Sequence, residues 1–345
     1  MDLRELTTED KGIYNDFVAG SNMGHFIQSW EWGEFKTLQG TPAHRYGVFN
    51  EKKLVATAQV TIHRVPKTNF KIAYLPKGPV VLGDAKKILP VFVDGFRQLA
   101  DAENLIFLKA EPKVESGQGW EEILTKNGFK RSNKWLFTEY NFVVDLKGTE
   151  EEVFSRVRRS TRYNIKLAAR KGVETAESSD TAEFETFIKL QKLTAKRQNF
   201  LVHANSYYRD AFAELKKHNM AHFLVGRIKG KVVAALVAWH FGKTIYYSYS
   251  AYDTDYRDSK PMDALIWKMI QVGRDLGCET LDMWGAANPE LGEKQAIWGS
   301  HQFKESFGPK LEHFVGPYDL PFKPLLYAAF TKLYPLALKV LAWAS

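Results

Sequence analysis

Between Arg156 and Lys171 the sequence holds seven arginines and lysines and no acidic residue. On a helix predicted over 150–171, four of them recur every fourth residue and share one face, with Arg159 beside them: Arg158, Arg162, Lys166 and Arg170. Such a stripe can follow the phosphates of a nucleic acid. A solvated helix face is the alternative, but like charges at this spacing repel one another. We therefore favour contact with RNA or another phosphate.

Two further cations stand at predicted helix ends. Arg197 lies ahead of the Tyr207-Tyr208 pair, and Lys36 closes the helix that begins near Trp30. An arginine in such a place can bind a diphosphate with two donors. Each could equally be an exposed cation that the helix dipole favours. The sequence leaves both alternatives open.

Several common catalytic motifs are absent. The chain has no P-loop, no G-x-G-x-x-G after a strand, no H-E-x-x-H and no G-x-S-x-G, which argues against nucleotide kinases, dinucleotide enzymes, zinc proteases and serine hydrolases. The single cysteine, Cys278, excludes a disulfide framework, and the nine histidines are scattered, so we expect no metal site. The layout of helices and hairpins is similar to that of acetyltransferases. Neither half, however, has an R/Q-x-x-G-x-G/A loop to hold coenzyme A.

An internal repeat at an offset of about 177 residues organises the chain. An aromatic pair leading into a short helix occurs at 29–35 and again at 206–212. A hairpin, a further strand, a helix and a last strand follow in both halves. This order predicts a mixed α/β fold made by tandem duplication of one domain, with a cleft between the two copies that could bind ligands. The layout of each copy is similar to that of acetyltransferase-like (GNAT-like) domains.

We place the first domain at 1–147 and the second at 148–316, with the tail 317–345 completing the first. The second begins where Thr149 and Glu152 form a capping-box pattern at the start of a helix. Each of these domains is long enough to form its own hydrophobic core.

Composition indicates where the protein works. The 48 basic and 40 acidic residues give a net charge of +8, which favours an anionic partner. The N-terminus lacks a signal-peptide pattern and no apolar run reaches about 18 residues, so we expect a cytoplasmic protein. The apolar tail from Pro324 to Trp343 contains Lys332, Pro335 and Lys339. It could pack on the protein or lie peripherally on the inner membrane face.

At this point the sequence resembles the Fem-type aminoacyltransferases, in particular the compact members without a helical arm. The motifs occur in family order over nearly the whole chain: Ser29-Trp30-Glu31-Trp32, Tyr74-Leu75-Pro76-Lys77-Gly78-Pro79, Leu108-Lys109-Ala110-Glu111-Pro112, the basic helix, Tyr247-Ser248-Tyr249-Ser250-Ala251, Leu281-Asp282-Met283-Trp284-Gly285 and Phe303-Lys304-Glu305-Ser306-Phe307-Gly308. The resemblance implies two acetyltransferase-like domains and transfer of an amino acid from aminoacyl-tRNA to a peptidoglycan stem peptide. The acyl donor would then be an ester on tRNA, so no cofactor is expected.

The resemblance also implies roles for individual residues. Lys36 and Arg197 would hold the diphosphate of UDP-MurNAc-pentapeptide, and Tyr249 and Tyr208 would contact this precursor. Phe303 and Lys304 would lie at the reacting ester, and Glu111 would line the same cleft. The basic residues Arg158, Arg159, Arg162, Lys166 and Arg170 would bind tRNA.

The implied reaction is aminolysis of an ester. Lys304 would stabilise the oxyanion, by about 3 kcal/mol if it behaves like an oxyanion-hole donor, and Glu111 or the tRNA hydroxyl would accept the proton. The acceptor would be a nucleotide-linked or lipid-linked precursor, and the product would be the interpeptide bridge. The alternatives are a lipid or protein acceptor, or a non-catalytic protein that binds RNA or a membrane surface.

Overall fold

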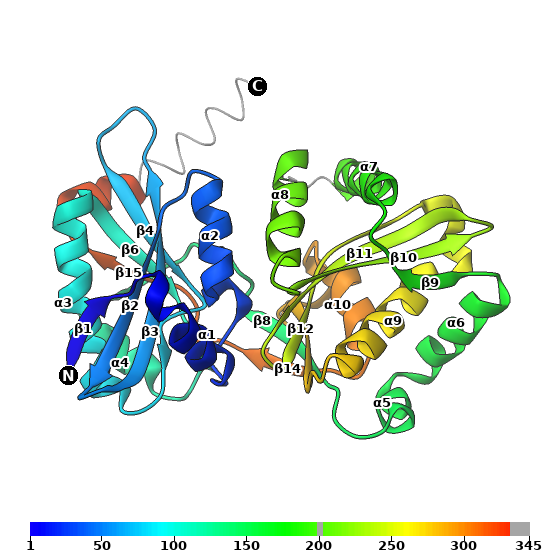
Figure 1. Cartoon of the computed structure of the whole chain (residues 1–345), viewed down its shortest axis with the longest axis horizontal. Coiled ribbons are helices and arrows are strands. Elements are labelled where there is room, and N and C mark those ends of the chain that lie inside the picture. Colours follow the sequence, from blue (N-terminus) through cyan, green and yellow to red (C-terminus); the bar gives the residue numbers. More distant parts are fainter. Residues whose placement is uncertain (199–202, 332–345) are drawn as a thin grey trace. The chain divides into compact units, whose positions relative to one another are not determined.

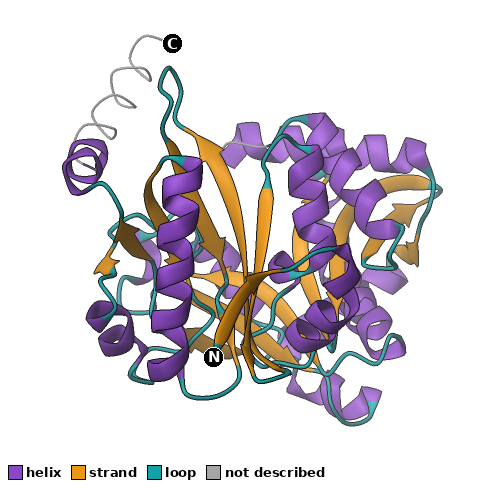
Figure 2. Cartoon of the chain, turned by 60° about the vertical axis from the view of Figure 1, so that its left-hand side comes forward, coloured by secondary structure: helices purple, strands orange, loops and turns teal. Residues whose placement is uncertain are grey.

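In the computed structural model, which describes residues 1–198 and 203–331, the chain forms two compact units (Figure 1). The first unit contains Met1–Phe137 and the described residues 314–331, and the second contains Thr138–His313. Each unit has one mixed sheet with helices packed on it (Figure 2). The predicted duplication of two mixed α/β domains is therefore confirmed.

The first unit is built on a sheet in the order β1-β2-β3-β4-β6-β15-β7, with β5 paired to β3. The strands are β1 (Asp2–Glu5), β2 (Ala43–Asn50), β3 (Lys53–Arg64), β4 (Lys71–Pro76), β5 (Val80–Val81), β6 (Leu105–Glu111), β7 (Lys130–Arg131) and β15 (Tyr318–Pro321). The helices are α1 (Lys11–Ala19), α2 (Trp30–Leu38), α3 (Ala85–Glu103) and α4 (Trp120–Lys126), with short 3-10 turns at Thr8–Asp10 and Phe26–Gln28.

The second unit has a sheet in the order β9-β10-β11-β12-β13-β8-β14. Its strands are β8 (Tyr140–Asp145), β9 (Glu174–Glu177), β10 (Ala221–Ile228), β11 (Lys231–Phe241), β12 (Thr244–Tyr252), β13 (Thr280–Ala286) and β14 (Lys310–His313). Its helices are α5 (Glu150–Arg156), α6 (Arg159–Arg170), α7 (Thr181–Gln198), α8 (Asn205–Lys216), α9 (Pro261–Asp275) and α10 (Trp298–Glu305), with 3-10 turns at Thr254–Ser259 and Gly292–Lys294.

The two units repeat the same layering. In the first, alternate residues of β3 face opposite ways: Ala56, Ala58 and Val60 join the core under α3, whereas Gln59 bonds to the turn before α2. In the second, α9 packs on the core face of β10 and β11. The short helix, hairpin, third strand, long helix and next strand thus recur in the predicted order.

The last strand of each copy pairs in the other copy's sheet. β8 follows β7 along the chain but pairs with β13 and β14, whereas β15 follows β14 but pairs with β6 and β7. The division therefore falls after Phe137, about ten residues before the boundary that we placed at 147. The boundary differs from the predicted one because β8 pairs with β13 and β14, which lie far from it in sequence.

The prediction of one basic helix over 150–171 is wrong at its centre. The capping box at Thr149 and Glu152 is confirmed, but α5 ends at Arg156 and α6 begins at Arg159. Val157 is buried with an extended backbone, and the backbone N–H of Arg158 donates to the carbonyl of Ser306 at 2.9 Å. Arg158 is therefore the residue before α6 and not part of the helical stripe.

The C-terminal segment packs on the first unit as far as the structure describes it. The Tyr327 hydroxyl donates to Asp319 at 3.0 Å, and Phe107 contacts both Tyr327 and Phe330. Among the described residues, no helix combines the length and apolar character needed to cross a bilayer. The other alternative for the tail, membrane contact around Lys332, Pro335, Lys339 and Trp343, concerns positions outside the described residues.

Gly308→Ala tests the packing at the break between α5 and α6. Gly308 has φ +73°, and a Cβ there would lie 2.4 Å from the carbonyl oxygen of Arg156. Gly292, at φ +52° with nothing within 4 Å of its Cβ position, is the matched control. We expect Gly292→Ala to lower the free energy of unfolding by about 1 kcal/mol and Gly308→Ala by more than about 2 kcal/mol, measured by urea denaturation. Equal losses would contradict this description of the break.

Candidate active site

Two parallel strands of the second unit separate partway along their length. β12 pairs with β13 only over Thr244–Tyr246, and beyond this point β12 stays with β11 while β13 continues along β8. Trp284, where the register of β13 shifts, has φ 64°. In the first unit the corresponding strands β4 and β6 pair from Lys71 to Pro76. The second sheet is therefore open where the first is closed.

A pocket of about 540 Å³ lies in the second unit beside the separated part of β12. Its walls come from α6, α7, β12, the loop before α9, the first turn of α9, and α10. This volume suits a ligand of nucleotide size. The lining residues important for chemistry are Asn164, Arg197, Tyr252, Arg257, Lys260, Asp263 and Phe303.

Lys304 is a buried cation next to this pocket. Phe303 lines the pocket, whereas Lys304, one residue later on α10, is only 8% exposed. Its Nζ donates to the carbonyl oxygen of Gly285 at 2.8 Å and lies 5.8 Å from the centre of the Tyr247 ring. Burial lowers the pKa of Lys304 from 10.5 to about 8, and the charge of Asp282 opposes this shift.

This arrangement can stabilise negative charge that develops nearby. A lysine ammonium has three N–H donors, and the Gly285 carbonyl takes one of them. Asp282 is held by the side chain of Asn141 at 3.0 Å and by the backbone N–H of Trp284 at 2.7 Å. A charge in such a low-dielectric place acts more strongly than it would in water. The opening of the sheet thus supplies a fixed cation beside a pocket.

Arg197 lines the same pocket as Phe303. It lies in the last turn of α7, as the sequence predicted, and its exposed guanidinium is 5.5 Å from the centre of the Tyr252 ring. The structure thus gathers Phe303, Lys304 and Arg197, three predicted site residues, in or beside one pocket.

Tyr208 and Tyr249 meet each other on another face of the sheet. Their rings lie 5.0 Å apart, nearly perpendicular, and neither lines the pocket. A bulge in β12 explains this position: the register against β11 shifts between Tyr247 and Tyr249. Tyr247 therefore packs in the core under α9 while Tyr249 packs under α8. Burial raises the pKa of both Tyr208 and Tyr249.

Glu111 and Lys36 belong to the first unit. Glu111, at the end of β6, is buried and accepts hydrogen bonds from the Tyr74 hydroxyl at 2.7 Å and the Leu136 backbone N–H at 2.8 Å. Lys36 lies in the last turn of α2, half-buried, with Nζ 5.8 Å from the centre of the Phe35 ring. Burial lowers the pKa of Lys36.

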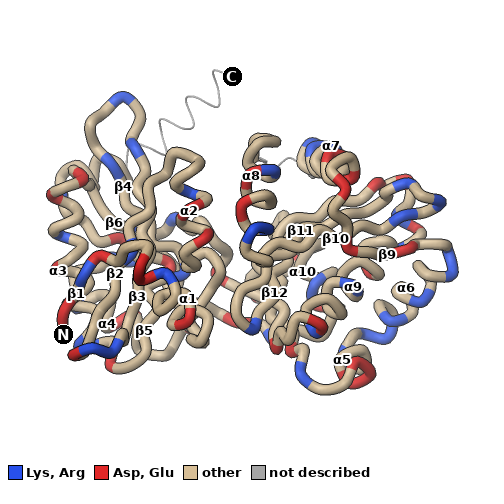
Figure 3. The backbone as a smooth tube through the Cα atoms, in the orientation of Figure 1, with Lys and Arg blue, Asp and Glu red and all other residues tan. Residues whose placement is uncertain are grey.

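The basic residues of α6 form a stripe that is shorter than predicted. The helix contains Arg159, Arg162, Lys166 and Arg170 and no acidic residue, whereas the acids of this region lie on α5 (Figure 3). Arg162 donates to the carbonyl of Ser155 at 2.6 Å. Arg158 forms an ion pair with Glu305 at 3.0 Å. The surface of α6 therefore still carries a net positive charge, but Arg158 precedes the helix and is not part of it.

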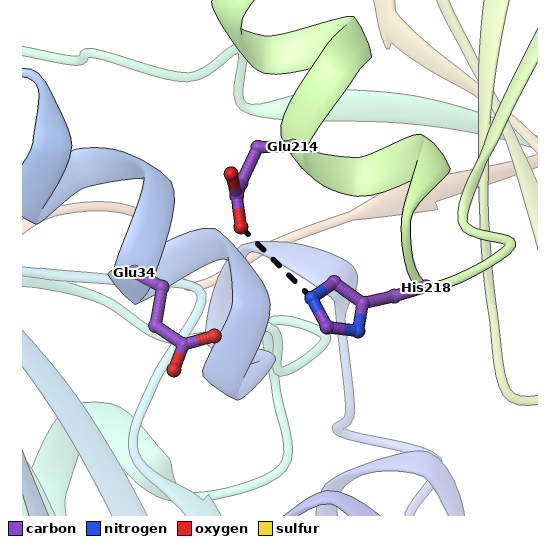
Figure 4. A group of neighbouring side chains, drawn as sticks. All are labelled: Glu34, Glu214 and His218. Carbon is purple, nitrogen blue, oxygen red and sulfur yellow. Dashed lines mark ion pairs between the residues drawn. The ribbon is translucent and has the colours of Figure 1, made fainter.

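Figure 4 draws three side chains that could be mistaken for metal ligands. Glu214 of α8 forms a 3.9 Å ion pair with His218 just beyond the helix. Glu34 belongs to the first unit, where it pairs with Lys11 at 3.1 Å. Within either unit taken alone, the described part of the chain brings no three His, Cys, Asp or Glu ligand atoms together.

Comparisons with known proteins agree with this architecture. Residues 7–127 match the FemAB family, and residues 155–304 match the acetyltransferase (GNAT) domain. The lipid II:glycine glycyltransferase of Staphylococcus aureus (strain MRSA252) is 23% identical over 97% of this chain and 96% of its own. The crystal structure of FemX superposes with a TM-score of 0.87 at 20% identity, covering 96% of this chain and 100% of FemX. A tandem GNAT protein from the clavulanic acid biosynthesis pathway gives 0.56 at 11% identity, covering 93% and 98%.

Lys304→Met tests the buried charge. Because folding lowers the pKa of Lys304 from 10.5 to about 8, the unfolded chain holds this proton more tightly than the folded chain between these pH values. The wild-type chain should therefore gain stability relative to the Met variant as pH rises from 8 to 10. Urea denaturation at several pH values measures the difference.

The exposed Lys294 provides the control for this comparison. Lys294→Met should leave a stability difference from the wild type that does not change over the same range. A difference for Lys304→Met that is also constant with pH would show that Lys304 is not desolvated in the folded protein.

Proposed function

Because this chain is a member of the Fem-type family of transferases, we propose that it transfers an amino acid from aminoacyl-tRNA to an amine of a peptidoglycan stem peptide. The acceptor is UDP-MurNAc-pentapeptide or its lipid-linked form, and the amide made is the first bond of an interpeptide bridge. The donor ester replaces coenzyme A, so the reaction uses no cofactor. We place the protein in the cytoplasm, which suits both substrates. With a lipid-linked acceptor it would work peripherally at the membrane.

The observation that carries this proposal is the buried ammonium of Lys304 behind Phe303 in the opened sheet. The relatives support the acceptor class, because one of them is named for glycyl transfer involving lipid II and this chain covers 96% of it. Membership in a family of transferases sets aside the non-catalytic alternative.

In the proposed reaction, the acceptor amine attacks the ester carbonyl of the aminoacyl-tRNA. A C–N bond forms, the carbonyl oxygen becomes an oxyanion, and collapse of this intermediate breaks the bond to the ribose oxygen. The ammonium of Lys304 stabilises the oxyanion, and Phe303 forms the apolar wall beside it. The proton of the amine leaves to the Glu111 carboxylate or to the departing ribose oxygen.

The remaining site residues bind the two substrates in this proposal. Arg197 and Lys36 hold the diphosphate of the acceptor, and Tyr208 and Tyr249 contact its sugar and peptide. The cations of α6, namely Arg159, Arg162, Lys166 and Arg170, follow the tRNA backbone. Arg158 contributes charge from the position before α6, where Glu305 partly neutralises it.

The test is transfer of labelled amino acids from a pool of charged tRNA to UDP-MurNAc-pentapeptide and, in parallel, to its lipid-linked form. We expect label on a precursor, its loss after RNase treatment, and a rate about 10²–10³ lower for Lys304→Ala. Lys294→Ala, which changes an exposed lysine, should be unaffected. Glu111→Gln separates the two proton routes, because only a proton acceptor needs the carboxylate.

Three outcomes would count against the proposal. RNase-resistant labelling would remove tRNA as the donor. Label that appears only on a membrane phospholipid or on a protein would replace the peptidoglycan acceptor, and full activity of Lys304→Ala would remove this lysine from the mechanism.

A further inference from the structure

Two segments that are far apart in sequence meet at one end of the sheet of the first unit. The loop between β3 and β4 is held there by Asn104, whose side chain donates to the carbonyl of Asn69 at 3.1 Å. Two residues after Asn104, the carbonyl of Ile106 accepts the backbone N–H of Lys323 at 3.1 Å. A helix at 324–331 begins directly after Lys323, so this helix and the loop share one end of the unit (Figure 2).

This end of the unit carries positive charge that no acid neutralises. The loop and the strand ends beside it hold three cations and no acid, and Figure 3 shows blue segments along it. Of these cations, Lys71 is paired with Glu103. Arg64 and Lys67 of the loop region, and Lys323 before the helix, form no ion pair or side-chain hydrogen bond with any described residue. Such a group of cations attracts an anionic surface.

Lys67 occupies a backbone position that favours glycine. The loop contains a tight turn in which the N–H of Thr68 donates to the carbonyl of Val65 at 3.2 Å, and Lys67 has φ 63°. Glycine or asparagine adopts this left-handed conformation at a lower cost than lysine. The charge of Lys67 therefore explains its presence here better than the turn does.

The helix at 324–331 has apolar residues on both sides. Its inner side contacts Phe107 through Tyr327 and Phe330. Its exposed positions are all apolar, and Leu325 is 88% exposed. They are Pro324, Leu325, Ala328 and Ala329. A surface helix in water normally has polar residues on its outer face, so this face suits the apolar boundary of a bilayer.

The sequence after residue 331 has the same composition. It contains Lys332 and Lys339 among leucines, alanines, a tyrosine and a tryptophan, and it has no acidic residue. Lysines among apolar and aromatic residues are typical of segments that lie in a membrane interface. Composition therefore favours the same partner as the exposed face of the helix.

The residues proposed to bind the acceptor are ordered along this unit. Burial and the nearby charge of Lys36 lower the pKa of His63, which directly precedes Arg64. Lys36 thus lies toward the loop end of the sheet, whereas Glu111 ends β6 at the opposite end. Between these ends β4 has six residues, about 20 Å of extended chain. A precursor with its diphosphate at Lys36 and its peptide toward Glu111 would point its lipid to the loop end.

We propose that this end of the first unit docks on the anionic surface of a lipid bilayer. Arg64, Lys67 and Lys323 contact lipid phosphates, and Leu325 enters the apolar boundary. The inference rests on the proposed function for one point, namely that the acceptor presented to Lys36 is the lipid-linked precursor.

Co-sedimentation of the full chain with vesicles tests docking without requiring transfer. Vesicles made of equal parts phosphatidylglycerol and phosphatidylcholine are compared with vesicles of phosphatidylcholine alone. We expect the wild-type chain to prefer the anionic vesicles, and this preference to fall at high salt. Arg64→Gln/Lys67→Gln should bind the anionic vesicles about twentyfold more weakly.

The matched control removes two cations from the other end of the unit. Lys86 and Lys87 are exposed in the first turn of α3, whereas the last turn of this helix leads to Asn104. Lys86→Gln/Lys87→Gln should bind both kinds of vesicle as the wild-type chain does.

Leu325→Glu tests the apolar contact. We expect it to weaken binding to the anionic vesicles about tenfold, because it removes an apolar side chain from the interface and adds a repelled charge. Leu291→Glu changes a leucine of the second unit that is 54% exposed and should have no effect.

Transfer assays separate the docking surface from the acceptor site. Arg64→Gln/Lys67→Gln should transfer to UDP-MurNAc-pentapeptide at the wild-type rate. With the lipid-linked precursor in anionic vesicles, its rate should be about tenfold lower.

The inference and the proposed function fail differently. A wild-type chain that binds neither kind of vesicle would overturn the docking surface and leave transfer to the nucleotide-linked precursor standing. Equal vesicle binding by the wild-type chain, Arg64→Gln/Lys67→Gln and Leu325→Glu would also overturn it. Vesicle binding that depends on these residues, without transfer to either precursor, would confirm the surface and reject the proposed function.

Discussion

The separation of β12 from β13 after Tyr246 is the constraint on which the candidate site depends. Once the strands part, the Gly285 carbonyl takes its hydrogen bond from Lys304. The same opening leaves room for the pocket beside β12. In the first unit, β4 and β6 remain paired along β4, so two copies of one fold differ where the chemistry is proposed. A short loss of strand pairing thus fixes both a buried cation and a space for a ligand.

The charged side chains of the second unit are arranged in keeping with the opening between β12 and β13. Arginines on α8 and β10 are neutralised by glutamates of α7, whereas Arg197 and Arg257 of the pocket form no ion pair within the described part of the chain. Lys260, the third pocket cation, lies near Asp263. An arginine that is paired with a glutamate costs the folded protein little stability. Cations without such a partner repel one another. The uncompensated cations therefore mark the surface where an anionic substrate would supply the missing charge, and α6 extends that surface away from the pocket.

The sequence predicted what depends on local pattern. The repeat, the hairpins, the capping box at Thr149 and the helix ends at Lys36 and Arg197 follow from periodicity and turn residues. It missed what depends on distant partners. The break before Arg158 arises from a bond to Ser306 about 150 residues away in sequence, and the placement of β8 depends on strands near the end of the second unit. The bulge that sends Tyr247 and Tyr249 to opposite faces, and the left-handed Lys260, carry no sequence signal that distinguishes them in advance.

The most direct test of the buried ammonium is the pH dependence of single-turnover transfer, corrected for spontaneous ester hydrolysis, for the wild-type chain and Lys304→Arg. Burial brings the pKa of Lys304 to about 8, whereas an arginine stays charged over the accessible range. We predict that the transfer rate of the wild-type chain falls above pH 8. Any activity that the Lys304→Arg variant retains should not fall over this pH range. A wild-type rate that rises or stays level through pH 9 would contradict a role for the charged lysine.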